Sequence, residues 1–153
     1  YHGRLKTYDY KTVRYAGHFS IIKALFDLGC FEDRVIGTAG QAIEPRRVMR
    51  DLMETRLALP DVRDLVVLRC KVIGRHQGRA MMAVYDLLDF HDESTGFSAM
   101  ERTTAFPAAL VAYMQARKLT PRGALPLELA IPARQYLDEL PAHDIRVAVT
   151  VTD

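Results

Sequence analysis

Apolar residues recur along the chain with two spacings, and each spacing predicts a different kind of element. Intervals of three and four residues place apolar side chains on one side of a helix. They predict helices over residues 18–28, 45–57, from Ser98 or Thr103 to about Lys118, and 134–140. Pro45 stands where the second helix begins, a position that tolerates proline, and Gly29 stands where it can cap the first.

Strand-like segments show alternating or nearly continuous apolar residues instead. Residues 5–15 are rich in Tyr, Thr and Val and contain no Gly or Pro, so they predict a strand that Ala16-Gly17 ends. Residues 64–73 and 79–90 flank a short polar loop and predict an antiparallel hairpin. Residues 145–151 alternate and predict a terminal strand. Period-two burial gives the hairpin an inward set, namely Val66, Leu68, Cys70 and Val72.

Together these elements predict one α+β domain, residues 1–153, with a mixed, largely antiparallel sheet covered by helices. With 49% hydrophobic and 26% charged residues, the chain has the composition of a domain that buries a core. Pro107 is compatible with the third helix if it lies in the first turn of the main segment. No repeat or flexible linker divides the sequence.

Charge and cysteine usage narrow the function classes. Twenty-one Lys and Arg against nineteen Asp and Glu leave a net charge of +2 spread along the chain, so no nucleic-acid footprint is expected. Cys30 and Cys70 lie in apolar surroundings without metal-ligand spacing, which predicts buried free thiols and a reducing, cytoplasmic setting. Neither a signal peptide nor a membrane span is indicated. The missing initiating Met indicates a fragment of a longer protein, although a trimmed full-length chain would look the same.

The segment Arg14-Tyr15-Ala16-Gly17-His18 has the most suggestive chemistry, because it puts a guanidinium, a phenol and an imidazole between a predicted strand and a predicted helix. Strand ends are common places for sites in α/β proteins. Arg14 can hold a substrate carboxylate with its bidentate fork, and His18 can donate a hydrogen bond or transfer a proton. A strand-surface ion pair for Arg14 and a helix cap for His18 are the structural alternatives.

A second candidate lies at the predicted start of the third helix. Residues 101–107 place hydroxyls and free backbone N–H groups where an anion, such as a cofactor phosphate, can bind. Thr103, Thr104 and Phe106 are its candidate residues. Simple helix capping is the alternative, since Thr is a common N-cap.

Metal and phosphate motifs are not indicated. The loop-like residues 36–41 contain Gly-Thr-Ala-Gly but lack the Lys-Ser/Thr of a phosphate loop and the GxGxxG of a dinucleotide fold. The five histidines are never spaced like helical metal ligands. An acidic turn lacks the spacing of a calcium loop, so no metal site is predicted. That turn contains Asp86, Asp89, His91, Asp92 and Glu93.

Three segments resemble a known family when they are taken together and in order. YKTVRYAGH, residues 10–18, is similar to the "TLRYPGH" signature of the saccharopine dehydrogenase C-terminal domain. The segment from EPRRVMRDL to VYDLLD, residues 44–89, resembles that family's helix and hairpin. DESTGFSAMERTTAFPAALVAYM, residues 92–114, resembles its "DE-x-TG-x-TAMARTTGFPAAIVA-x-M" motif. Within that family, the sequence most resembles the group of lysine 6-dehydrogenase, carboxynorspermidine dehydrogenase and saccharopine reductase.

The resemblance implies a fold of the glyceraldehyde-3-phosphate dehydrogenase C-terminal type, and the substrate-side domain of a homodimeric oxidoreductase. Such an enzyme transfers hydride between NAD or NADP and the carbon bearing the amine of lysine, saccharopine or a carboxylated polyamine. The resemblance implies that Arg14, Tyr15 and His18 contact the amino-acid substrate. It also implies that Thr103, Thr104 and Phe106 line the seam with an upstream domain, which binds most of the cofactor. No catalytic base, metal, nucleic acid or membrane is implied.

The sequence differs from the family pattern at two residues, and it lacks the glycine-rich motif that binds a dinucleotide. Ala16 stands where the family has Pro, and Ala105 stands where it has Gly, so the geometry of a substrate site is affected more than the fold. The sequence contains no GxGxxG, so this segment alone is expected to be inactive. The alternative function is a non-catalytic binding or oligomerisation module that keeps the fold.

Overall fold

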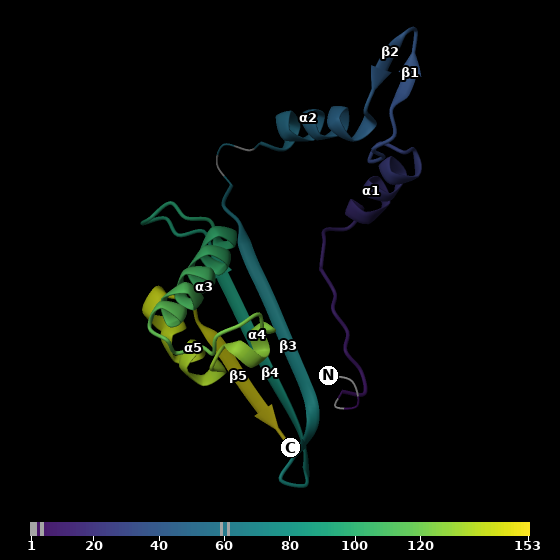
Figure 1. Ribbon diagram of the computed structural model, residues 1–153. Coiled ribbons are helices and arrows are strands. Elements are labelled where there is room, and N and C mark those ends of the chain that lie inside the picture. Colours follow the sequence, from purple (N-terminus) through teal and green to yellow (C-terminus); the bar gives the residue numbers. More distant parts are fainter. Residues whose placement is uncertain (1–2, 4, 59, 61) are drawn as a thin grey trace. The chain divides into compact units, whose positions relative to one another are not determined.

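The computed structural model describes residue 3, residues 5–58, residue 60 and residues 62–153 (Figure 1). Contacts between Cα atoms divide the chain into two compact units, Tyr1–Pro60 and Asp61–Asp153. Helices and antiparallel two- and three-stranded sheets make up the described part, which confirms the α+β class. In that part, every helix is too short or too polar to span a bilayer.

The first unit contains α1 (His18–Asp27), β1 (Ile36–Thr38), β2 (Gln41–Ile43) and α2 (Pro45–Leu57). Residues 5–15 precede α1 and belong to no strand ladder of the described chain, so the predicted strand is wrong. Their side chains are exposed, with Tyr15 at 92%. Tyr, Thr and Val favour extended backbone, but a strand also needs a neighbour for its N–H and C=O groups.

Helix α1 ends as the sequence predicts, at Gly29. The Gly29 N–H donates to the Phe26 carbonyl at 2.9 Å, and the Cys30 N–H donates to the Leu25 carbonyl at 3.0 Å. This pair of bonds is a Schellman motif, which satisfies the last helical carbonyls and requires a left-handed residue. Gly29 has φ +79°, which a glycine adopts without strain.

The residues predicted as a loop at 36–41 instead form most of a small hairpin. Strands β1 and β2 pair antiparallel through Thr38 and Gln41, which leaves Ala39 and Gly40 as the turn. Both turn residues have positive φ, 49° and 80°, as a type I′ turn requires. Gly40 therefore marks a tight turn with strand pairing on both sides, whereas Gly37 lies within β1. The two strands are too short to produce a long apolar run in the sequence.

Helix α2 begins at Pro45, as predicted, and is tied to the loop that follows α1. The Arg46 Nε donates to the Phe31 carbonyl at 2.9 Å and lies 3.1 Å from Asp33 Oδ1. The Arg46 N–H donates to the Glu32 carbonyl at 3.3 Å. One arginine at the start of the helix thus orients it against residues 31–33.

The second unit is built on a three-stranded antiparallel sheet in the order β3 (Leu65–His76), β4 (Arg79–Phe90) and β5 (Val147–Thr152). The predicted hairpin of β3 and β4 is confirmed, with Gln77 and Gly78 at positive φ in its turn. Helices α3 (Ala99–Ala116), α4 (Leu127–Ala130) and α5 (Ala133–Glu139) and a 3₁₀ turn (Leu140–His143) complete the unit (Figure 1).

The core of the second unit lies between α3 and one end of the sheet. Leu110, Met114, Leu140 and Ile145 are buried, and Leu87 of β4 and Val147 of β5 pack against them. Leu87 pairs with Val147 in the register, so these two side chains share the face on which the core forms.

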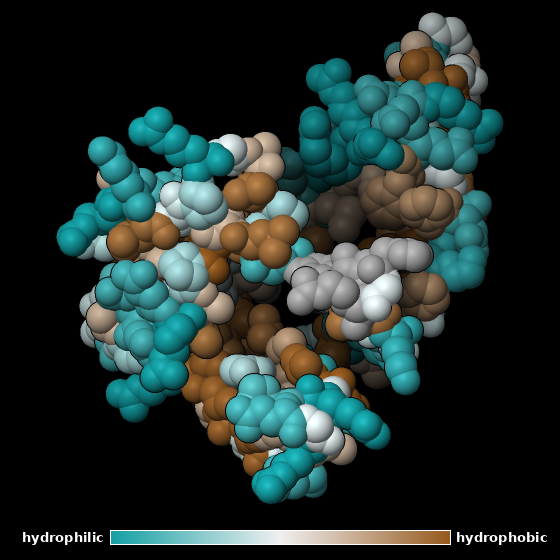
Figure 2. All heavy atoms as spheres, turned by 60° about the horizontal axis from the view of Figure 1, so that its bottom comes forward, coloured by the Kyte–Doolittle hydropathy of each residue, from teal (hydrophilic) through white to brown (hydrophobic). Residues whose placement is uncertain are grey.

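The inward face of β3 was predicted correctly, but its burial was not. Leu68 lies opposite Leu87, which places Val66, Leu68, Cys70 and Val72 on the face of the core. Only Val66 is half-buried, whereas Leu68 and Val72 are 54% and 52% exposed and Cys70 is exposed. The prediction of two buried thiols is therefore wrong for Cys70, and Cys30 is half-buried. Exposed apolar side chains are also visible as brown atoms in Figure 2.

Pro107 lies inside α3 rather than in its first turn, which corrects the prediction. Proline has no N–H, so the carbonyl of Thr103 lacks the donor that an ordinary helix would supply. The helix nevertheless continues to Ala116. The helix begins at Ala99 with Ser98 as its N-cap, at the earlier of the two predicted positions.

Candidate functional site

Arg14, Tyr15 and His18 lie along the segment that leads through a turn into α1. The His18 N–H donates to the Tyr15 carbonyl at 3.1 Å, and Gly17, the N-cap, has φ +88°. Arg14 and Tyr15 are exposed on the extended segment, while His18 is the first residue of α1. His18 is thus not the helix cap, and the guanidinium of Arg14 is accessible to a ligand.

His18 also lines a groove between the two helices of the first unit. Side chains of α1 and α2 enclose about 400 Å³, and Arg14 is not among them. The groove is almost entirely apolar, and His18 and Arg56 are its two polar members. Arg56 was not a candidate in the sequence, where it stands as an ordinary basic residue in the last turn of α2. The remaining lining residues are Ile21, Ile22, Leu25, Leu52, Met53 and Leu57.

The second unit contains a buried ionic centre around Arg102 of α3. The residue is 7% exposed, and its Nε donates to Asp89 Oδ2 at 3.1 Å, while Asp89 is 8% exposed. A second guanidinium nitrogen donates to Asp92 Oδ2 at 3.2 Å, and the third reaches the Asp144 carbonyl at 3.3 Å. Arg102 therefore joins the end of β4, the turn at 92–97 and the residues before β5.

The first turn of α3 has its N–H groups occupied by side chains of the chain itself. The Ala99 and Met100 N–H groups donate to the two carboxylate oxygens of Asp64, at 2.6 and 2.9 Å. The Glu101 N–H donates to the Ser98 hydroxyl at 3.1 Å, and the Glu101 carboxylate accepts from the Ser98 N–H at 2.8 Å. This capping box and the Asp64 carboxylate fill the place where an anion would bind.

The predicted anion site at residues 101–107 is corrected by this geometry, because these residues lie beyond the helix start. Thr103 donates its hydroxyl to the Ala99 carbonyl at 2.8 Å, and Thr104 directs its hydroxyl to the Met100 sulfur at 3.7 Å. Phe106 packs against the core and forms an edge-to-face pair with Phe97, with ring centroids 5.8 Å apart. The two threonines thus hydrogen-bond within α3, and only Phe106 packs against the core.

The acidic turn after β4 is an organised loop. Asp92 accepts from the Ser94 N–H at 2.9 Å and from the hydroxyls of Ser94 and Thr95, both at 2.7 Å. These hydrogen bonds, with that of the Ser94 hydroxyl first, hold the pKa of Asp92 far below its usual value. In the described part of the chain, no three His, Cys, Asp or Glu side chains gather as metal ligands. The buried Nδ1 atom of His91 has no hydrogen-bond partner there.

Acidification is expected to destabilise the protein through Asp92. A carboxyl with a depressed folded-state pKa contributes stability above its unfolded pKa of about 4, and that contribution is lost as the pH falls. The thermal midpoint should therefore drop as the pH decreases through the range below about 5. Asp92→Asn should lower the midpoint at neutral pH and flatten the acid limb. Ser94→Ala removes one donor and so raises the folded-state pKa of Asp92, which should reduce the total loss of stability along that limb. Calorimetry at a series of pH values measures both, and parallel acid limbs for wild type and Asp92→Asn would contradict the assignment.

One comparison with known proteins covers both units. Residues 2–145 match the family model described as the saccharopine dehydrogenase C-terminal domain. The match includes the turn at Arg14 to His18 and the residues around Arg102.

Proposed function

Because the chain belongs to the saccharopine dehydrogenase C-terminal domain family, we propose that it is the substrate-side domain of an NAD(P)-dependent oxidoreductase. The proposed reaction is at the CH–NH or CH–NH₂ group of an amino acid, namely lysine, saccharopine or a carboxylated polyamine. The observation that carries the proposal is the match to a dehydrogenase domain over residues 2–145.

Two observations support the proposal that the cofactor is not bound mainly by this chain. Its sequence has no GxGxxG, and the N–H groups in the first turn of α3 are already bonded to Asp64 and Ser98. In the proposal the cofactor is therefore held mainly by another domain of the full-length protein. This chain contributes binding and orientation of the amino acid.

Arg14 is proposed to hold the substrate carboxylate, with Tyr15 and His18 beside it. Arg14 is exposed at a turn that also directs the chain into α1, so its two-nitrogen fork is available to an approaching carboxylate. His18 is proposed to donate a hydrogen bond to the substrate or to assist a proton transfer, because an imidazole ring carries nitrogens that can donate or accept a hydrogen bond. Thr103, Thr104 and Phe106 are proposed to support the seam with the cofactor-binding domain indirectly, through the packing of α3.

We further propose that the full-length enzyme works as a cytoplasmic homodimer in lysine metabolism. The family resemblance and the two open edges of the sheet, β3 and β5, support a dimer.

A dehydrogenase assay of the full-length protein tests the proposal. With lysine, saccharopine and carboxylated polyamines, one substrate should give cofactor-dependent turnover with NAD or NADP, followed at the absorbance of the reduced nicotinamide. The 153-residue chain alone should fold and bind neither dinucleotide tightly in calorimetry. Turnover with none of these substrates would favour the alternative function, a binding or oligomerisation module. Tight NAD(P) binding by the isolated chain would refute the proposal that another domain binds the cofactor.

A further inference from the structure

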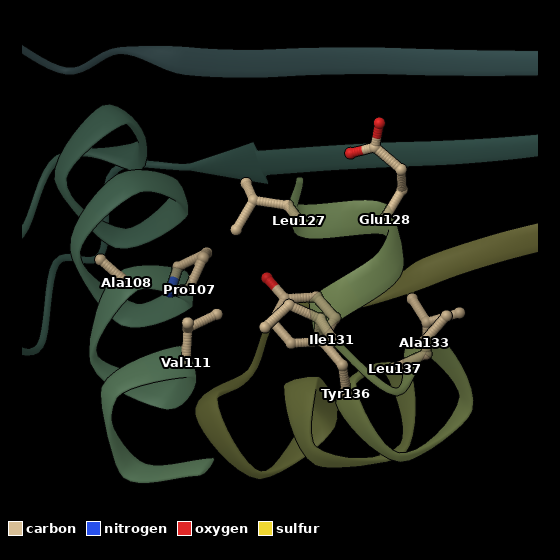
Figure 3. A pocket seen from close by; sticks show the side chains of 9 residues that line it. All are labelled: Pro107, Ala108, Val111, Leu127, Glu128, Ile131, Ala133, Tyr136 and Leu137. Carbon is tan, nitrogen blue, oxygen red and sulfur yellow. The ribbon is translucent and has the colours of Figure 1, made fainter. Parts of the chain in front are cut away.

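The helices of the second unit form a hollow of about 770 Å³, and its lining does not include the residues proposed to bind the amino acid. One wall is α3, through Pro107, Ala108 and Val111, and the opposite walls come from α4 and α5 (Figure 3). A volume of roughly 300–1,000 Å³ is that of sites for small organic ligands. The other lining residues are Leu127, Glu128, Ile131, Ala133, Tyr136 and Leu137.

Tyr136 supplies the polar group of this hollow. Its hydroxyl points into the space between α3 and α4 (Figure 3). The ring is half-buried against the core, and within the described residues the hydroxyl has no hydrogen-bond partner. Burial raises the pKa of the phenol, so at neutral pH it is an uncharged O–H donor. An oriented donor in an apolar wall is the arrangement that fixes a ligand in place.

The charge of the walls decides which ligand fits. Glu128 is the one ionisable carboxylate of the lining, and its side chain is directed toward the strands, away from the Tyr136 hydroxyl (Figure 3). A charged ligand would therefore lose its hydration with no opposite charge directed at it, which costs much free energy. A zwitterionic amino acid does not suit this hollow.

We infer that the hollow between α3, α4 and α5 is a binding site for an uncharged, mainly apolar small molecule with an acceptor oxygen. The apolar body lies against Val111, Leu127 and Leu137, and the acceptor takes the hydrogen bond of Tyr136. Its lining contains none of the residues proposed to bind the amino acid, and the inference does not depend on the proposed dehydrogenase activity.

Nile red, an uncharged dye with a carbonyl acceptor, tests the site in the full chain. We expect saturable one-to-one binding with enhanced fluorescence. Tyr136→Phe removes the hydroxyl and keeps the ring, so affinity should fall roughly two- to tenfold, which is the range of one neutral hydrogen bond. Val111→Trp fills the hollow and should weaken binding more than about tenfold, since the bulky ring overlaps the ligand. An anionic naphthalene sulfonate dye should bind at least about tenfold more weakly than Nile red.

Ala112→Trp is the matched control, because Ala112 lies next to Val111 on α3, is exposed and does not line the hollow. It should bind Nile red like the wild type. Circular dichroism and thermal unfolding establish that each variant is folded. Unchanged affinity in both folded Tyr136→Phe and Val111→Trp would overturn the inference. So would absence of saturable dye binding together with a loss of self-association in Val111→Trp, which would make the hollow a protein interface.

Discussion

Replacing Arg102 by methionine is expected to destabilise the folded protein by roughly 3–5 kcal/mol, the cost of removing one partner of a buried ion pair. The substitution keeps an apolar stem but leaves the carboxylate of Asp89, itself 8% exposed, without its charged donor. It also frees the Asp144 carbonyl and one contact of Asp92. Chemical denaturation of wild type and variant measures the difference in free energy of unfolding.

A control at an exposed ion pair and a double variant at Arg102 separate the effect of charge from that of packing. Arg69→Met removes the partner of Asp86, and although that pair has two hydrogen bonds at 2.6 and 2.9 Å, its side chains are 69% and 40% exposed. Its loss should change the free energy of unfolding far less than the loss of Arg102, because solvent screens an exposed pair. The double variant Arg102→Met with Asp89→Leu removes the unpaired charge and should recover part of the stability. Equal effects for the two single variants, or no recovery in the double variant, would contradict a buried ionic centre.

The sequence predicts most helices and the long hairpin because their signals are local. The apolar spacing of α1, the proline at the start of α2 and the polar loop before Arg79 each determine structure within a few residues. The Schellman end at Gly29 is of the same kind, since its donors and acceptors lie within six residues of one another.

Elements that depend on distant partners were predicted less well. Residues 5–15 have the composition of a strand, yet strand formation is decided by a neighbour that composition does not specify. At Pro107 the local signal predicts a helix break that does not occur. Packing of Leu110 and Met114 in the core keeps α3 helical across this proline. Burial of the inward face of β3 likewise depends on which elements cover it.

The ionic centre was missed for the same reason. Arg102 stands between Glu101 and Thr103 in a predicted helix, and nothing in its immediate neighbours distinguishes it from a surface arginine. Its partners lie 10, 13 and 42 residues away. A usable signal was the apolar context of Asp89, since a carboxylate inside a strand pattern needs a cation when it is buried.

If the chain belongs to the proposed dehydrogenase, replacing Arg14 by lysine in the full-length protein is expected to lower kcat/KM by roughly thirty- to a thousandfold. Lysine keeps the positive charge but cannot form the two parallel hydrogen bonds that a guanidinium makes with a carboxylate. Loss of a charge-assisted pair in a partly closed site costs roughly 2–4 kcal/mol, or one decade of rate per about 1.4 kcal/mol. Arg14 is exposed on an extended segment, so the melting temperature should change little.

The kinetic pattern distinguishes substrate binding from a structural role. Arg34→Lys, at an exposed arginine of the same unit that pairs with Glu32, is the matched control and should leave kcat and KM at wild-type values. A substrate analogue without the carboxylate should be used equally by wild type and Arg14→Lys, because the lost contact is then absent from both. If Arg14→Lys instead reduces activity equally with both substrates, or lowers the melting temperature, then Arg14 acts through the fold and does not bind the carboxylate.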